Sequence, residues 1–306
     1  MSVIVKKRVR FDYFQVWCRR HDNEKNFIYE ELFDLENILI KAQSIDVKDR
    51  KYNFGGENAI LQTVDNLRQI KDKKCLWGLQ FIRGRENDLP GIVKPDGTFE
   101  YMDLPDDEYM GEEVTAIYDS ELAVIVIQRN RDSLSPSGIE TYFKLIYMGE
   151  DIFFKPIITP DVYTKLQNEK NFRVFDVSFA NLRNSQLTTN KKALLSIFKA
   201  VEDFDPINAE FKFTMGQFKK IDGLAEQAVM DTLRELNGQK EVTRLEVTVI
   251  EDDGNSKFYN LIEDRVHSYI TMTYSRTEGI VYSRLIDAIL PYYFDRRPYL
   301  QKILKT

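Results

Sequence analysis

The chain has 306 residues, of which 43% are hydrophobic, 12% aromatic and 30% charged, and its formal net charge is −6. This balance is typical of a folded globular protein and excludes a disordered tail, a coiled coil and a collagen-like chain. The length suits two domains. No run approaches the roughly 18 consecutive apolar residues of a membrane span, and we expect a cytoplasmic protein.

Patterns in the first third predict strands and helices in alternation. Residues 8–19 alternate apolar and polar side chains, which predicts a strand. An apolar stripe at helical spacing predicts a helix over 27–42. Residues 57–71 indicate a second helix or a turn-rich segment, and 76–83 a further strand.

The negative charge is concentrated in one segment, residues 86–121. It holds twelve Asp and Glu residues and one lysine, so it carries −11 and leaves +5 for the rest of the chain. Because Pro-Gly and Pro-Asp-Gly sequences punctuate it, we expect loops and short edge strands there. The net charge is therefore a poor guide to the remaining surface.

A nearly continuous apolar run over 121–128 predicts a central strand covered on both faces. Ser135 followed by Pro136 predicts the start of a helix that reaches about residue 147. The second half predicts further strands and helices, namely strands at 152–158, 172–179, 207–213 and 266–274, helices at 159–168, 190–201, 217–236 and 281–290, and a hairpin around Asp253-Gly254. We expect the last helix to be interrupted at Pro291.

Together these elements predict an α+β fold with mixed, largely antiparallel sheets, packed helices and two domains. The first domain would cover residues 1–149 and contain the acidic loop segment 86–121. The second would cover 150–306 and contain the hairpin and the terminal helix.

Basic residues provide the candidate nucleic-acid contacts. Arg129 and Arg131 follow the buried strand and precede a helix start, where free backbone N–H groups favour phosphate. A salt bridge from these arginines to the acidic segment is an equally good interpretation. The other candidates are Arg183, Lys191, Lys192, Lys199, Lys212, Lys219 and Lys220.

The acidic residues provide a second candidate surface. Asp106, Asp107, Glu108, Glu112 and Glu113 could meet a basic protein partner. Their spacing does not match a calcium loop, and a solvated acidic loop is the commoner interpretation.

Motifs for catalysis are scarce. The chain lacks a phosphate-binding GxxxxGK[ST] loop, a GxGxxG sequence and a GxSxG elbow, and it has two histidines. A zinc site formed by Cys18, His21, Cys75 and His267 would draw its second pair from distant parts of the chain. Glu246 with Lys257 matches a magnesium-dependent nuclease poorly. We therefore expect no enzyme activity, no metal and no cofactor.

The order of elements carries a resemblance. A buried strand, the sequence QRNR, a helix, the strand INAEFKF, the helix start GQFKKIDGLAEQAV and the hairpin EDDGNSKFY resemble phage-exclusion Rex A-like proteins and the DNA-binding subunit of the Kiwa antiphage system. The preceding part, from FIRGREND onward, looks like an uncharacterised prokaryotic and phage family. This resemblance implies a dimeric, non-enzymatic, sequence-tolerant DNA-binding protein of phage defence. The alternative is a protein-interaction module, an inhibitor or sensor of a phage or host complex, that uses the acidic loop. A metal-dependent nuclease is a third hypothesis, ranked below these two.

Overall fold

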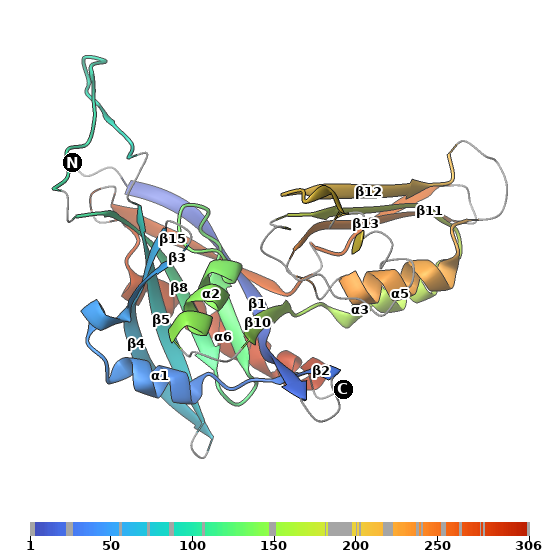
Figure 1. The fold of residues 1–306 in the computed structure, drawn as a ribbon, viewed down its shortest axis with the longest axis horizontal. Coiled ribbons are helices and arrows are strands. Elements are labelled where there is room, and N and C mark those ends of the chain that lie inside the picture. Colours follow the sequence, from blue (N-terminus) through green and yellow to red (C-terminus); the bar gives the residue numbers. More distant parts are fainter. Residues whose placement is uncertain are drawn as a thin grey trace. The chain divides into compact units, whose positions relative to one another are not determined.

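The computed structural model has the α+β class that the sequence predicts, with mostly antiparallel sheets (Figure 1). The structure describes residues 4–22, 27–54, 57–71, 74–85, 89–105, 108–146, 151–180, 182, 198–199, 201, 203–216, 223–236, 239, 241–251, 255–262, 265–275, 277 and 279–304. The chain divides into two compact units, one of residues 1–154 with 267–306 and one of residues 155–266. The sequence-based division at residue 150 did not anticipate that the last forty residues return to the first unit.

A curled nine-stranded sheet forms the first unit (Figure 1). Its path runs β10-β1-β9-β8-β5-β4-β3, and β15 and β2 also pair with the long strand β1. The strands are β1 Ile4–Asp22, β2 Phe27–Leu32, β3 Lys51–Phe54, β4 Glu57–Lys71, β5 Lys74–Arg85, β8 Met110–Asp119, β9 Val124–Gln128, β10 Asp151–Pro156 and β15 His267–Ser275.

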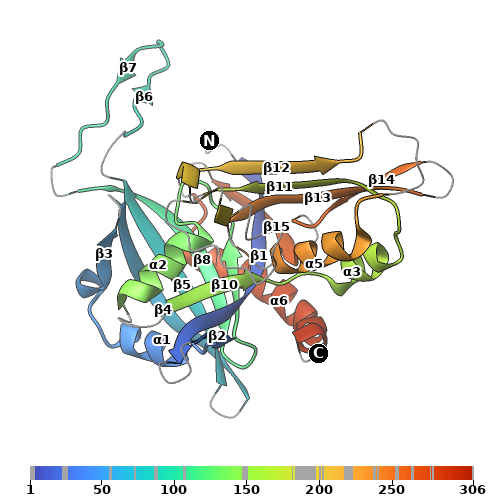
Figure 2. The same cartoon turned by 45° about the vertical axis from the view of Figure 1, so that its right-hand side comes forward.

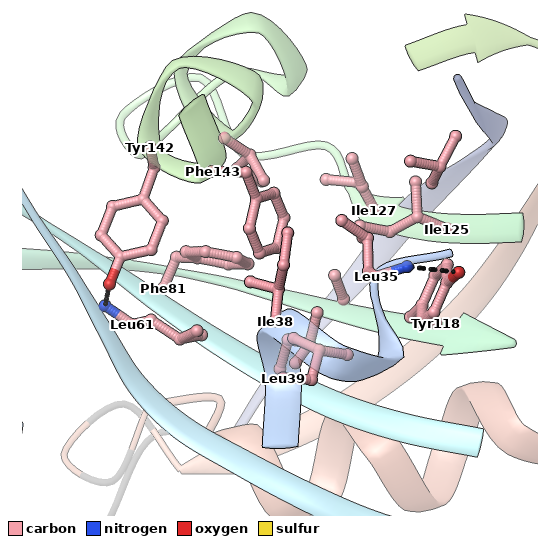
Figure 3. Close-up of a cluster of buried hydrophobic side chains, with 14 of the residues drawn as sticks. Leu35, Ile38, Leu39, Leu61, Phe81, Tyr118, Ile125, Ile127, Tyr142 and Phe143 are labelled. Atoms are coloured by element: carbon pink, nitrogen blue, oxygen red, sulfur yellow. Dashed lines mark hydrogen bonds between the residues drawn. The ribbon is translucent and has the colours of Figure 1, made fainter. Parts of the chain in front are cut away.

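Helices α1 (Glu36–Gln43) and α2 (Pro136–Ile146) contribute to the buried cluster on one face of this sheet. Figure 3 shows Leu35 and Tyr142 among its side chains. The Tyr142 hydroxyl donates to the Arg50 carbonyl at 2.7 Å and accepts from the Leu61 N–H at 3.3 Å. The Tyr118 hydroxyl accepts from the Leu35 N–H at 2.9 Å. Each buried hydroxyl is therefore bonded, and each fixes a strand to the segment that crosses it.

The terminal helix α6 (Tyr282–Leu304) is not interrupted at Pro291, so that prediction was wrong. A proline removes one backbone donor from a helix, and tertiary contacts can offset that cost. Here the completely buried Asp119, at the end of β8, accepts from Tyr293 and from the Arg297 Nε at 2.7 Å. Arg297 also pairs with Glu121. These bonds hold the helix against the sheet just beyond the proline.

The segment 57–71, predicted as a helix or a turn-rich segment, and the first part of the helix predicted over 27–42 are strands. The structure has β4 over Glu57–Lys71, and β2 replaces the first part of the helix expected over 27–42. The pairing of β4 with β5 shifts register three times, the first time between Leu61 and Thr63. Each bulge breaks the alternation of side chains. Apolar residues such as Leu61, Val64 and Leu67 then fall three apart, which imitates a helix.

The acidic segment contains both expected and unexpected structure. A short hairpin of β6 (Ile92–Val93) and β7 (Phe99–Glu100) matches the prediction. The last third is β8, which pairs with β5 on one side and β9 on the other, so it is a central strand rather than an edge.

The second unit is a four-stranded antiparallel sheet in the order β12-β11-β13-β14. Its strands are β11 Phe172–Phe179, β12 Ala209–Thr214, β13 Val242–Ile250 and β14 Ser256–Asn260. Helices α3 (Pro160–Gln167) and α5 (Glu226–Leu236) lie on one face (Figure 2) and complete a separate buried cluster. The described part of the helix predicted over 217–236 begins only at Glu226, and the helix predicted over 190–201 lies largely outside the described residues.

Candidate nucleic-acid interface

Half of the sequence-predicted site residues lie outside the part of the chain that the structure describes. Arg183, Lys191, Lys192, Lys219, Lys220, Asp106 and Asp107 lie outside the described residues. Of the others, Lys199 and Arg131 are exposed. Lys199 and Lys212 belong to the second unit, and Arg129 and Arg131 belong to the first.

Lys212 is engaged within a network of charges. It projects from β12 beside Asp176 of β11, with 3.1 Å between its Nζ and the Asp176 Oδ2. Arg244 lies 3.1 Å from the other oxygen of Asp176 and also pairs with Glu210. These two cations and two carboxylates neutralise one another. Among the described residues around Asp176, this face of the sheet therefore has no excess of positive charge for phosphate binding.

The first unit has a more favourable arrangement on β1. Lys6, Arg8 and Arg10 occupy alternate positions, so their side chains leave the same face of the strand. Arg129 extends the neighbouring strand, since its N–H donates to the Arg10 carbonyl at 2.8 Å. We call Lys6, Arg8, Arg10 and Arg129 the β1 cation cluster. The sequence interpretation missed its first three members, although the K-x-R-x-R alternation was visible.

Tyr269 of β15 organises this cluster. It lies directly opposite Arg10 across the strand pair. The Arg8 guanidinium carbon is 3.6 Å from the centre of the Tyr269 ring, and that of Arg10 is 5.9 Å from it. Stacking of a guanidinium on a ring holds the cation in place without neutralising it. Tyr269 as a residue is 36% exposed, and Arg8 covers one face of its ring.

One carboxylate balances part of the charge. Asp12 accepts from the Arg10 Nε at 2.6 Å and lies 3.4 Å from the Arg129 Nε. Burial alone would lower the pKa of Arg10, but its hydrogen bond to Asp12 and the charge of that group raise it overall. Among the described residues, no carboxylate pairs with Lys6 or Arg8. Arg129 thus has an acidic partner, but that partner is on β1 and not in the acidic segment.

The predicted acidic surface is divided by the structure. Glu112 and Glu113 are half-buried on β8, and the Glu113 carboxylate accepts from the Gln80 amide at 2.6 Å. Glu108 is exposed. The hairpin exposes apolar side chains that the sequence interpretation did not single out, namely Ile92, Val93, Phe99 and Tyr101.

The described residues contain no group of three or more His, Cys, Asp or Glu side chains placed to hold a metal ion. Cys18 lies near Glu31, and Cys75 accepts from the Asn66 amide. Glu246 accepts from Asn260, while Lys257 pairs with Glu169 and Glu251. Cys18, Cys75 and Glu246 thus have other protein partners.

These features define an α+β protein of two units with a cationic strand face on the first. The chain belongs to a family of unknown function, DUF6731, which matches residues 4–303. No curated protein matches it. In the described part of the chain, no helix is long and apolar enough to cross a membrane.

Proposed function

We propose that this chain is a non-enzymatic DNA-binding protein that contacts phosphates through the β1 cation cluster. The observation that supports this is the geometry of four cations on adjacent strands with one carboxylate among them. Phosphate contacts fix a protein on DNA but read no sequence, so the binding is sequence-tolerant. A role in phage exclusion or antiphage defence, which the resemblance implies, is part of this proposal.

Salt dependence tests the proposal. Each phosphate that a cation neutralises contributes about −0.9 to the slope of log K against log salt for duplex DNA. Combining Arg8→Ala with Arg129→Ala should make that slope about 1.8 less steep on any duplex sequence. The matched control is Lys48→Ala, an exposed lysine of the 3-10 helix Val47–Arg50 in the same unit, which should leave the slope unchanged.

Fluorescence anisotropy at several salt concentrations measures these slopes. Absence of binding to duplex and single-stranded DNA at low salt would overturn the proposal. So would an unchanged slope in the double variant while the protein remains folded by circular dichroism.

A second candidate function is protein interaction through the β6–β7 hairpin. Val93 is 69% exposed and Tyr101 83% exposed, next to acidic residues. Exposed apolar side chains with a charged rim are typical of protein-binding surfaces. A pull-down with wild-type protein and with a Val93→Ser, Tyr101→Ser variant tests this. A partner captured equally by both would exclude the hairpin as its binding site.

A further inference from the structure

The outer edge of β12 has the properties of a pairing strand. β12 is the terminal strand of its sheet, and Figures 1 and 2 show it at that edge. Its six residues pair with β11 without a register shift. It contains neither proline nor glycine, and Phe213 is 45% exposed. Edge strands are usually protected by bulges, proline, short length or charged side chains. β12 has no bulge or proline, and its two charges, Glu210 and Lys212, are of opposite sign.

The hydrogen-bond pattern shows which backbone groups of β12 face outward. The Met215 N–H donates to the Arg173 carbonyl at 3.0 Å. The backbone N–H and C=O groups of the odd-numbered residues of β12 therefore point toward β11. Bonded and non-bonded pairs alternate in an antiparallel ladder. The N–H and C=O groups of Glu210, Lys212 and Thr214 therefore point away from β11. No described residue forms a strand pair with this edge.

We propose that a second copy of this chain docks on this edge, with β12 of one protomer antiparallel to β12 of its partner. A two-fold axis at Phe211 places Glu210 opposite the partner's Lys212, and Lys212 opposite the partner's Glu210. Both pairs consist of residues whose backbone groups face outward, so both can form ladder hydrogen bonds. The result is a continuous eight-stranded sheet with a self-complementary interface.

The charges of Glu210 and Lys212 favour the register with its axis at Phe211. An axis at Glu210 would place two carboxylates directly opposite each other, and an axis at Lys212 would oppose two ammonium groups. Directly opposite like charges destabilise a strand pair, whereas opposite charges stabilise it. Of the registers centred within Glu210–Lys212, the one at Phe211 alone pairs unlike charges.

The charges within each protomer extend the same alternation. Lys212 pairs with Asp176, and Glu210 pairs with Arg244. Across the junction the order becomes Asp176, Lys212, the partner's Glu210 and the partner's Arg244. Each charge then has neighbours of opposite sign. On the other face the exposed Phe213 ring would lie opposite the partner's Ala209, which is small enough to accept it.

Complementary charge variants test the docking mode without any nucleic acid. Size-exclusion chromatography with light scattering should give twice the 36.0 kDa chain mass for the wild type at micromolar concentration. Glu210→Lys alone should shift the protein to the monomer mass, because two lysines of one protomer then face two of the other. Lys212→Glu alone should do the same with carboxylates. An equal mixture of the two variants should recover the dimer mass, since each lysine then meets a glutamate.

The control is Lys165→Glu, a charge reversal on the exposed surface of α3, which should remain dimeric. Recovery of the dimer in the mixture shows that both variants are folded and that the two positions face each other. A monomeric wild type, dimeric single variants, or a mixture that stays monomeric while circular dichroism shows folded protein would each overturn the proposal. None of these outcomes depends on DNA binding by the first unit.

Discussion

Asp119 is expected to be the residue whose charge contributes most to docking α6 on the first sheet. It is completely buried, and its two oxygens have different partners. Oδ1 accepts from the backbone N–H of Glu121 at 2.9 Å and of Leu122 at 3.2 Å. Oδ2 accepts from the Tyr293 hydroxyl and from the Arg297 Nε. The substitution Asp119→Asn keeps the shape but removes the charge that faces Arg297. Its NH₂ group must also lie against donors, either those of Tyr293 and Arg297 or the backbone N–H groups of Glu121 and Leu122.

The size of the effect follows from that geometry. Removing one partner of a buried ion pair costs about 3–5 kcal/mol, because the other charge is left without compensation. Arg297 retains Glu121, so we expect the lower end, about 3 kcal/mol of unfolding free energy. For a unit of this size, 1 kcal/mol shifts Tm by about 2–4 °C, so the variant should melt about 6–12 °C below the wild type.

Urea denaturation and calorimetry measure both quantities. Asp49→Asn, at an exposed site, is the matched control and should change the free energy of unfolding by less than about 0.5 kcal/mol. Arg297→Met should also destabilise the unit. Because Asp119 and Arg297 are in contact, the double variant should cost less than the two single changes added together. A loss below about 0.5 kcal/mol in Asp119→Asn, or strict additivity, would refute the reasoning.

Three further outcomes are expected. Ser135→Ala should lower the free energy of unfolding in urea by about 1 kcal/mol, because the Ser135 hydroxyl accepts from the Gly138 N–H at the start of α2. An unchanged urea midpoint would exclude a stabilising role for this cap. Gly78→Ala should cost about 1–3 kcal/mol, since a Cβ there would lie 2.3 Å from the Tyr282 hydroxyl, and adding Tyr282→Phe should recover part of the loss. The hydrogen bond from Tyr259, with a further one from Lys257, outweighs the opposing effect of burial and lowers the pKa of Glu169 below its usual 4.5. The stability that ionised Glu169 contributes is therefore complete above pH 4.5 and is lost as the pH falls through the folded pKa. Glu169→Gln should therefore show a smaller loss of stability below pH 4.5 than the wild type, and identical acid profiles would contradict this.

Much of the fold could be predicted because, in most helices and strands, the apolar side chains recur at one clear spacing. The strand expected over 172–179 coincides with β11, and the hairpin strands and the α2 start were confirmed. The failures have local causes. Bulges gave β4 a helical spacing of apolar residues, and Pro291 was taken as a break although Tyr293 and Arg297 hold the helix beyond it. In both cases, contacts between residues that are separated in the chain decided the secondary structure. A local sequence pattern does not contain such contacts.

The candidate site was harder to predict than the fold. Clusters of basic residues in the sequence mark where cations are numerous. Only the structure shows whether each cation has a carboxylate partner that neutralises it. Lys212 was a candidate and is neutralised by Asp176, whereas Arg8 was not a candidate and stacks on Tyr269. Tyr269 is 261 residues away from Arg8 in the chain, so no local pattern could have connected them.

The contacts of individual carboxylates also change the interpretation of the acidic segment, residues 86–121. Its charge of −11 suggests one negative surface, yet several of its carboxylates have internal partners. Asp119 and Glu121 hold Arg297, and Glu113 accepts from Gln80. The exposed carboxylates that remain in the described residues lie mainly around the β6–β7 hairpin, where apolar side chains are exposed as well. The segment therefore divides into a structural part, which contributes to the core of the first unit, and a surface part suited to protein contacts. The negative net charge of the chain is consequently no argument against phosphate binding by the β1 cation cluster. Charges attract one another mainly within a screening length of about 8–10 Å, so the charges near the cluster decide its attraction for phosphate.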